Sequence, residues 1–390
     1  MAPSLATTVA GISLPTCVYN ASGPRTGSSA ALAKIAASDS GGILAKSATV
    51  SSQTGNPQPR TWHEPETNVA SLNSEGLPNS GIDYYISPDT ITESVGSATS
   101  DKKPYMVSIS GKNLHDNLEM LKKIADARKS DPRIAAVELN LACPNVIGKP
   151  IIAYDFDQMD AVLAAVSNLG GVPPLGVKMP PYMDGPHFER AAQVINKYKG
   201  MVKYVASINT IGNAFAVDIA AEMPVISSNG GFAGLSGRAV KYTALANVKK
   251  MRDLLDPSID VVGVGGVETG ADAFEMILCG ASAVQVGTCH WNEGPKCFDR
   301  ICDELRAIMV EKGYGSVDDF KGKLKPWSKE GAAIARAAKK AKQGGGGGVK
   351  AGGSVTSVKK GGNDPYVLIT AVLAIVVAVL LADRFGMVEI

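Results

Sequence analysis

Residues 136–146 read AVELNLACPNV, and this stretch places polar side chains directly after an apolar run. Its first six residues have the pattern of a buried strand, and a proline marks a turn soon afterwards. Asn140, Cys143 and Asn145 stand where the strand would end. A thiol can take up a proton, and each carboxamide both donates and accepts hydrogen bonds. The pattern predicts an active site at the C-terminal end of a strand; the simpler alternative is a small cysteine buried in a turn.

The first 320 residues repeat this arrangement. Seven further apolar segments have the length of a strand, and stretches with helical spacing separate several of them. Eight strands alternating with helices predict a (β/α)8 TIM barrel, with a doubly wound α/β sheet as the alternative. No Gly-x-Gly-x-x-Gly motif follows the first segment, which counts against a dinucleotide-binding sheet. The expected strands are residues 17–21, 43–47, 105–109, 136–141, 175–179, 204–208, 261–265 and 283–287.

Two segments fall outside the repeat. Residues 4–15 precede the first strand and predict a hairpin that closes the floor of the barrel. Residues 210–240 are long for a single connection, and we expect them to form an excursion over the barrel mouth.

Polar residues and glycines recur at the C-terminal ends of the expected strands, where barrels of this class build their active sites. Glycine-containing turns follow the last two strands. In this fold such turns bind phosphate through backbone N–H groups, which predicts a phosphorylated cofactor such as FMN. The strand-end residues are Lys46, Asn140, Cys143, Lys178, Asn209, Thr210, Gly265, Gly266, Gly287 and Thr288.

The C-terminal part of the chain has a different composition. Residues 321–362 hold eleven Lys or Arg residues and one acidic residue, whereas the whole chain has a net charge of +2. Residues 366–382 are seventeen uncharged, mostly aliphatic residues, which predicts a membrane-spanning helix near the shortest usable length. We therefore expect a barrel over 1–320, a basic glycine-rich linker over 321–365, a tail anchor over 366–382 and a short tail over 383–390. We expect a single-pass membrane protein whose catalytic domain lies in the cytoplasm.

Other composition features limit the function classes. The six cysteines form no CxxC pair, so reduced thiols are expected. The four histidines are too scattered to predict a metal site. The small net charge predicts no nucleic-acid partner.

Ordered motifs along residues 1–320 resemble those of dihydroorotate dehydrogenases, specifically the fumarate-using class 1A. Cys143 marks class 1, because the membrane-bound quinone class uses serine as its base. The motifs are YNASGPR (19–25), LAKSAT (44–49), GNPQPR (55–60), LNSEGLPNSGIDYY (72–85), VSISGKN (107–113), ELNLACPNVIGKP (138–150), GVKMPPY (176–182), SINTIGN (207–213), TALANV (243–248), GVGGV (263–267) and VQVGT (284–288).

The resemblance implies a homodimeric FMN enzyme that oxidises (S)-dihydroorotate to orotate in pyrimidine (UMP) biosynthesis, with fumarate as electron acceptor. Cys143 would take the C5 proton while a hydride passes from C6 to flavin N5. Lys46 would pair with the substrate carboxylate, and Lys178 would stabilise negative charge on the reduced flavin. Substrate binding is assigned to Lys46, Asn73, Gly76, Leu77, Asn140, Asn145, Asn209 and Thr210. Cofactor binding is assigned to Ala21, Ser22, Gly23, Lys46, Ser47, Asn140, Lys178, Gly237, Gly265, Gly266, Gly287 and Thr288.

Three positions depart from the family pattern. Glu75 replaces a usual methionine in the loop that borders the substrate, and a carboxylate there would repel an anionic ligand unless it points to solvent. Ala142 replaces a usual serine beside the base. Thr210 replaces a usual serine and keeps the hydroxyl.

Three other functions compete with this interpretation. The same oxidation could pass its electrons to a membrane quinone. A related flavin enzyme could act on dihydrouracil or on reduced pyrimidines in RNA, in which case Lys46 would lack a carboxylate partner. The chain could also be a catalytically silent, membrane-tethered FMN protein.

Overall fold

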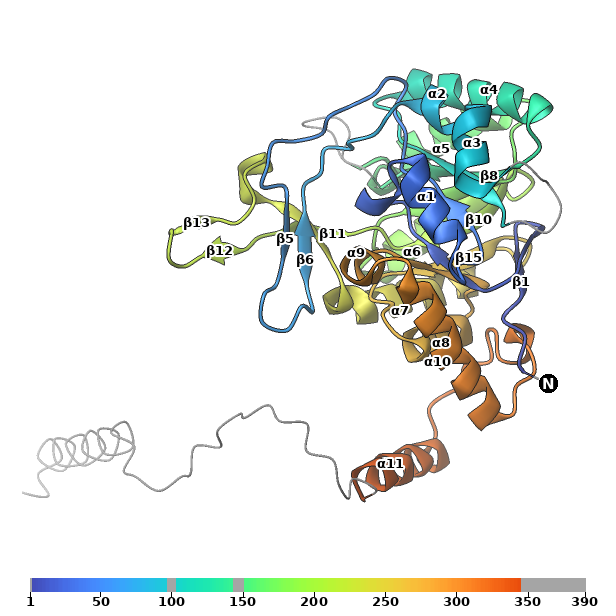
Figure 1. Ribbon diagram of the computed structural model, residues 1–390. Coiled ribbons are helices and arrows are strands. Elements are labelled where there is room, and N and C mark those ends of the chain that lie inside the picture. Colours follow the sequence, from blue (N-terminus) through green and yellow to red (C-terminus); the bar gives the residue numbers. More distant parts are fainter. Residues whose placement is uncertain (1, 97–102, 143–150, 345–390) are drawn as a thin grey trace, which may run out of the picture. The chain divides into compact units, whose positions relative to one another are not determined.

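The structure, a computed structural model, describes residues 2–96, 103–142 and 151–344. These residues divide into two compact units, one ending at Lys325 and one beginning at Pro326. The first unit is an α/β barrel (Figure 1). The second contains helix α11 (Lys329–Gly344), which is rich in alanine and lysine, both strong helix formers.

Eight parallel strands form the barrel, as the sequence predicts, and they exclude the doubly wound alternative. Each lies within or close to its expected segment. Their order in the sheet is β3, β16, β15, β10, β9, β8, β7 and β4. The strands are β3 (Val18–Asn20), β4 (Ile43–Leu44), β7 (Tyr105–Ile109), β8 (Ile134–Asn140), β9 (Leu175–Met179), β10 (Val202–Ser207), β15 (Asp260–Val264) and β16 (Ala283–Val286).

The side chain of Asn20 joins β3 to β4, the two strands at the ends of this order. Its Nδ2 donates to the Leu44 carbonyl at 2.6 Å, and its Oδ1 accepts from the Leu44 N–H at 3.0 Å. Asn20 is fully buried. Because β4 is only two residues long, this carboxamide supplies backbone partners that a short ladder would leave unpaired.

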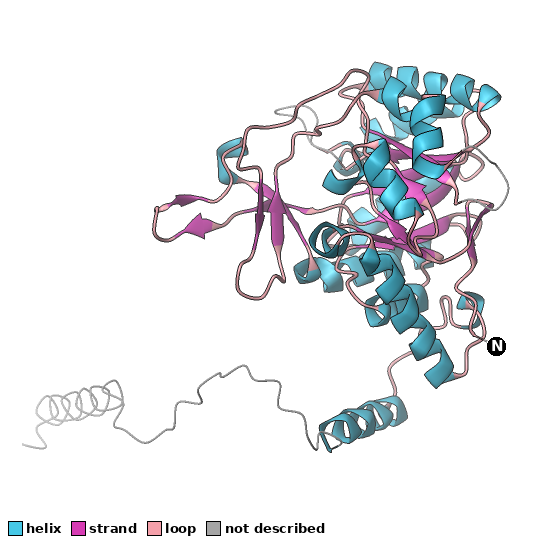
Figure 2. Cartoon of the chain, in the orientation of Figure 1, coloured by secondary structure: helices cyan, strands magenta, loops and turns pink. Residues whose placement is uncertain are grey.

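Helices surround the barrel (Figure 2). Several begin at a side chain that caps the first turn: Asn113, Asp155 and Asp184 each accept the backbone N–H three residues on. The helices of this unit are α1 (Ser29–Ala36), α2 (Ile82–Tyr85), α3 (Pro88–Val95), α4 (Leu114–Ser130), α5 (Phe156–Ser167), α6 (Gly185–Lys197), α7 (Lys241–Leu254), α8 (Gly270–Leu278), α9 (Thr288–Glu293) and α10 (Lys296–Lys312).

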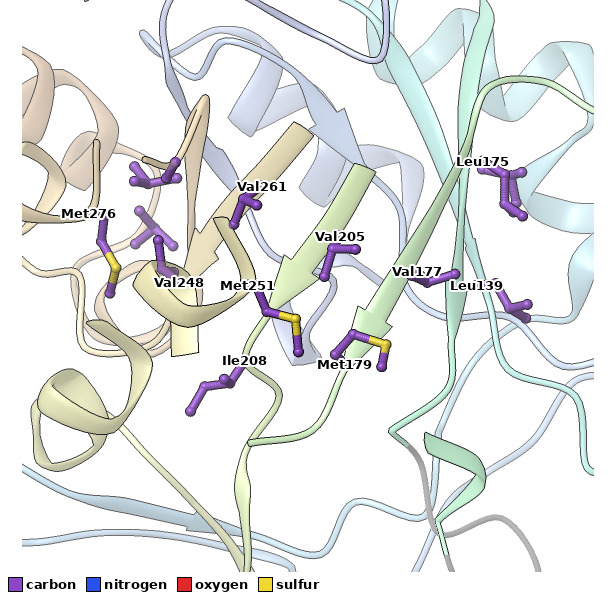
Figure 3. Packing of buried hydrophobic residues seen from close by; sticks show 14 of the residues in the cluster. Leu139, Leu175, Val177, Met179, Val205, Ile208, Val248, Met251, Val261 and Met276 are labelled. Atoms are coloured by element: carbon purple, nitrogen blue, oxygen red, sulfur yellow. The ribbon is translucent and has the colours of Figure 1, made fainter. Parts of the chain in front are cut away.

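The main core lies between the strands and these helices (Figure 3). Leu139, Val177 and Val205 project from β8, β9 and β10, while Met251 and Met276 project from α7 and α8. All five are fully buried. Since successive side chains of a strand point to opposite faces, the residues on either side of Leu139 face the barrel interior.

The N-terminal segment forms the predicted hairpin. Strands β1 (Thr7–Val9) and β2 (Ile12–Leu14) pair antiparallel, and Ala10 and Gly11 make the turn with positive φ. Val9 and Leu14 pack against residues of the barrel interior. The Ala10 N–H donates to Asp260 Oδ2 at 2.8 Å, at the N-terminal start of β15. The hairpin therefore closes the barrel at its N-terminal end.

A second sheet is built from the connections that follow β4 and β10, on one side of the barrel (Figure 1). Because both connections leave the C-terminal ends of their strands, this sheet starts at the barrel mouth, which agrees with the predicted excursion over 210–240. Its strand order is β11 (Ile211–Ala214), β14 (Ala233–Ser236), β6 (Ser71–Asn73) and β5 (Thr61–His63), and a separate pair is formed by β12 (Val217–Asp218) and β13 (Met223–Pro224).

The prediction of a tail-anchored, single-pass membrane protein is not upheld. Across the described ranges, no helix has the length and apolar character needed to cross a bilayer. Helices α4 and α10 have 17 residues each and carry charged side chains, whereas a span needs about 20 predominantly apolar residues. The segment that prompted the prediction, residues 366–382, lies outside the described residues.

Candidate active site

Three predicted site residues meet at the C-terminal ends of neighbouring strands. The β8–β9 register places Asn140 opposite Lys178. Asn209 follows β10, its backbone N–H donates to the Met179 carbonyl at 2.8 Å, and its Nδ2 donates to Asn140 Oδ1 at 3.3 Å. The parallel register of β8, β9 and β10 thus gathers an ammonium and two carboxamides from three segments of the chain.

Lys178 points into the barrel and is only 7% exposed. Its Nζ donates to Gln285 Oε1 on β16 at 2.8 Å. Burial lowers the pKa of this ammonium, because removal from water disfavours the charged form, and the negative charge of Glu138 opposes the shift. A cation kept at this depth is suited to stabilising negative charge on a ligand at the mouth.

A polar layer that the sequence analysis missed lies inside the barrel next to Lys178. Gln285 Nε2 donates to Glu138 Oε2 at 2.8 Å and to the Tyr19 hydroxyl at 3.2 Å. The Tyr204 hydroxyl donates to Glu138 Oε2 at 3.4 Å. The signal was present in the sequence: an acidic residue and a glutamine each interrupt an otherwise apolar strand, AVELNL and AVQV.

The second sheet brings two more predicted substrate residues to the same place. Asn73, at the end of β6, directs its Nδ2 to the Gly234 carbonyl of β14 at 3.5 Å. A Cβ at Gly234 would lie 2.3 Å from Thr210 Oγ1, so only glycine allows this approach. The Thr210 N–H donates to Asn209 Oδ1 at 2.8 Å. Asn73 and Thr210 are thereby linked to the carboxamides at the strand ends.

The loop that carries Gly76 and Leu77 is held in a fixed conformation. Both residues have positive φ, at 66° and 52°. Gln53 Nε2 donates to the Gly76 carbonyl at 2.6 Å. The neighbouring Glu75 does not point to solvent: its Oε2 lies 3.1 Å from Arg60 Nε, and its side chain is 12% exposed. Arg60 therefore neutralises the carboxylate that was expected to repel an anion.

Most of the predicted cofactor residues lie at the ends of the barrel strands β15, β16, β3 and β4, whereas Asn140 and Lys178 lie on β8 and β9 and Gly237 follows β14 of the second sheet. The Ala21 N–H donates to the Val286 carbonyl at 2.9 Å, which holds the ends of β3 and β16 together. Ser22 Oγ accepts from the Ser47 N–H at 2.7 Å and so connects the end of β3 to the segment after β4. Besides Asn140 and Lys178, the remaining members of this predicted set are Gly23, Lys46, Gly237, Gly265, Gly266, Gly287 and Thr288.

The space beside two of these glycines fits a phosphorylated flavin. Cβ atoms built at Gly23 and Gly287 would have no neighbour nearer than 3.8 Å, which leaves room beside the backbone at both turns. A ligand can therefore approach the backbone closely at these two positions.

The surrounding backbone fixes the positions of two further predicted site residues, Lys46 and Gly237. Two others lie outside the described ranges. Lys46 is buried directly after β4, and its backbone N–H donates to the Thr26 carbonyl at 3.0 Å. Gly237 has φ 82°, and a Cβ there would lie 2.9 Å from the Val69 carbonyl. Cys143 and Asn145 lie outside the described residues. Within the described part of the chain, no group of three or more His, Cys, Asp and Glu side chains could hold a metal ion.

Comparisons with solved structures agree with the barrel. The crystal structures of DHODH from Eimeria tenella, in complex with ferulenol and in ligand-free form, both match with a TM-score of 0.66. Their identities are 22% and 23%; the matches cover 82% and 83% of this chain and 88% and 93% of those chains. At this identity the likeness shows the fold alone.

Sequence comparisons identify the family. A family model described as dihydroorotate dehydrogenase matches residues 4–309. The chain is 43% identical to the dihydroorotate dehydrogenase A (fumarate) of Lactococcus lactis subsp. lactis, over 82% of this chain and 99% of that protein. It is 42% identical to the dihydroorotate dehydrogenase (fumarate) of Kluyveromyces lactis, over 83% of this chain and 99% of that protein. The chain therefore belongs to the dihydroorotate dehydrogenase family of oxidoreductases.

Proposed function

We propose that this protein oxidises (S)-dihydroorotate to orotate with FMN as its cofactor and fumarate as its electron acceptor. The family is flavin-dependent, and the fumarate-type relatives match along nearly their whole length. The observation that carries the proposal is the cluster of Asn73, Asn140, Asn209 and Thr210 beside Lys178. Carboxamides and a hydroxyl suit a ring whose edge alternates N–H and C=O groups.

Each residue then has a defined task. FMN, when bound, supplies the acceptor for the hydride that leaves C6 of the substrate. Cys143 takes the proton from C5 as the base, and Asn145 follows it in the same segment. Lys46 pairs with the substrate carboxylate. Lys178 holds a positive charge near the position where negative charge accumulates during reduction.

The phosphate of FMN is assigned to the turns after β15 and β16. Gly265 and Gly266 have positive φ, at 119° and 72°, and Thr288 begins α9 directly after Gly287. Glycine allows a backbone to approach phosphate oxygens closely. Ala21, Ser22, Gly23 and Ser47 lie at the adjacent strand ends.

We further propose a homodimer. Apolar side chains of the excursion after β10 are exposed, among them Phe215, Val217, Met223 and Ile219, the last at 89%. A cluster of exposed large hydrophobic residues is typical of a protein–protein contact. Light scattering of the purified chain tests this, with Ile219→Asp expected to shift the protein to monomer; a wild type that is monomeric at all concentrations contradicts it.

A single series of measurements tests the catalytic proposal. The purified protein should be yellow, and the flavin released on denaturation should co-migrate with FMN. Dihydroorotate should bleach it, whereas dihydrouracil should not. Turnover should proceed with fumarate and be slow with a short-chain quinone. Bleaching by dihydrouracil alone, or turnover with the quinone alone, would reject the proposed substrate or acceptor respectively.

A further inference from the structure

The interior of the barrel joins Lys178 to a buried carboxylate through one carboxamide. Lys178 Nζ donates to Gln285 Oε1 at 2.8 Å, and Gln285 Nε2 donates to Glu138 Oε2 at 2.8 Å. Glu138 is 1% exposed and Gln285 is fully buried. A cation, an amide and an anion therefore form one line across strands β9, β16 and β8.

The architecture of the strands brings Tyr204 to the same carboxylate. Gly176 on β9 is in register with Glu138 on one side and with Tyr204 on the other. A Cβ at Gly176 would lie 2.0 Å from the Tyr204 ring, so the ring lies directly over this glycine. The missing side chain lets the Tyr204 hydroxyl cross β9 and reach Glu138.

The charges at the two ends fix the orientation of the Gln285 amide. With Oε1 toward the ammonium and Nε2 toward the carboxylate, each end of the amide faces the group that it stabilises. The reversed amide would place an NH₂ against the ammonium and an oxygen against the carboxylate. In a low-dielectric interior that arrangement would be strongly disfavoured.

We propose that Glu138 is a positioning residue that acts through Gln285: it aims the Lys178 ammonium at the barrel mouth and keeps it protonated at neutral pH. This inference rests on the proposed flavin at that mouth. Lys178 itself is the group that meets the cofactor, and Glu138 and Gln285 act only through it. An ammonium buried without a compensating anion would lose its proton, because the neutral amine avoids the cost of desolvation.

The other charged and titratable groups of the interior do not replace Glu138. Burial raises the pKa of Tyr19 and of Tyr204, so both hydroxyls are neutral at physiological pH. Asp260 is engaged at the floor by the Ala10 N–H and the Ser282 hydroxyl. Lys46, at the end of β4, is a second cation and cannot compensate Lys178. Glu138 is the charge that opposes the lowering of the Lys178 pKa.

Three variants of nearly identical shape test the proposal. Glu138→Gln removes the anion, and Gln285→Glu adds a second anion beside Lys178. The double variant E138Q/Q285E has the same net charge as wild type, but its anion is at position 285 instead of position 138. Glu311→Gln, on the exposed surface of α10, is the matched control. The readout is the pH dependence of the flavin midpoint potential and absorption, measured on the flavin-loaded protein without substrate.

The charges alone set the expected order of the variants. The flavin potential and absorption should change slope at the alkaline pH where Lys178 loses its proton, and we call this point the alkaline break. In Glu138→Gln the alkaline break should move down by about one pH unit or more, which is a tenfold change in the proton equilibrium. It should move up in Gln285→Glu, and it should return at least to the wild-type position in the double variant. The Glu311→Gln control should coincide with wild type.

Other outcomes decide against the proposal. A folded, flavin-loaded Glu138→Gln whose break coincides with that of wild type overturns it. If neither single variant folds, the double variant decides: its folding supports charge compensation, and its failure to fold overturns the proposal, because it preserves the net charge of the layer. The readout requires bound flavin but no dihydroorotate turnover, so a failure of the proposed substrate is distinguishable from a failure of this inference.

Discussion

Arg60 and Glu75 form an ion pair beside the loop assigned to the substrate, with Arg60 Nε 3.1 Å from Glu75 Oε2. The two side chains are 19% and 12% exposed. The same guanidinium donates from Nη1 to the Thr54 and Asn56 carbonyls, at 2.8 and 3.1 Å. Arg60 therefore ties the segment after β4 together and neutralises the Glu75 carboxylate.

Removal of Arg60 should expose the effect of that carboxylate. In Arg60→Met, Glu75 is left unpaired, and we expect weaker orotate binding and a loss of about 2–3 kcal/mol of stability. Glu75→Met should bind orotate as well as wild type or better. The double variant should recover most of the affinity lost in Arg60→Met. Orotate titration followed by flavin absorbance measures all three, and equal affinities throughout would show that the pair does not influence the ligand.

Cys143 is predicted to be the catalytic base. Cys143→Ala should retain flavin and bind orotate, yet lose turnover by about 10²–10⁴-fold, the usual contribution of general-base catalysis. Cys143→Ser should also be slow, because a serine hydroxyl needs surroundings that activate it. Stopped-flow reduction by dihydroorotate is the measurement, and near-normal reduction in the alanine variant would reject the assignment.

The two lysines should give different kinetic defects. Lys46→Ala should weaken orotate binding and turnover together, since it removes the proposed partner of the substrate carboxylate. Lys178→Ala should mainly slow flavin reduction, because its charge matters most as reduction proceeds. Binding titrations and single-turnover rates separate the two effects. Identical changes in both quantities for both variants would contradict this division of roles.

Asp272 should stabilise the turn that carries Gly265 and Gly266 in a pH-dependent manner. It accepts the N–H groups of Glu268 and Thr269 and pairs with Lys241 Nζ at 2.5 Å. Burial would raise its pKa, but these hydrogen bonds outweigh burial and lower it. Its stabilisation is therefore present above the ordinary pKa of 3.8 and is lost as pH falls through the lower folded value.

Asp272→Asn should accordingly cost about 1–3 kcal/mol at neutral pH and weaken flavin binding. The difference from wild type should shrink as the pH falls below about 4. Denaturant unfolding at several pH values measures this. A difference that is independent of pH would show that the Asp272 charge is not responsible.

Much of the barrel was predictable because local patterns dictate it. Apolar runs such as 175–179 and 283–286 are strands, and helical spacing identifies the segments between them. Parallel strands bring their C-terminal ends to one rim, so Asn140, Lys178 and Asn209 could be placed together from sequence position alone. The N-terminal hairpin was predictable for the same local reason.

The sequence by itself determined the eight-strand barrel, the rim on which polar residues gather and, by resemblance, the family. Only the tertiary structure decided the partners of those residues. Glu138 and Gln285 are 147 positions apart and meet because β8 and β16 face each other across the barrel interior. Arg60 and Glu75 meet because β5 and β6 pair in a second sheet. Such contacts depend on strand register and barrel closure, and a one-residue slip would turn each side chain to the opposite face.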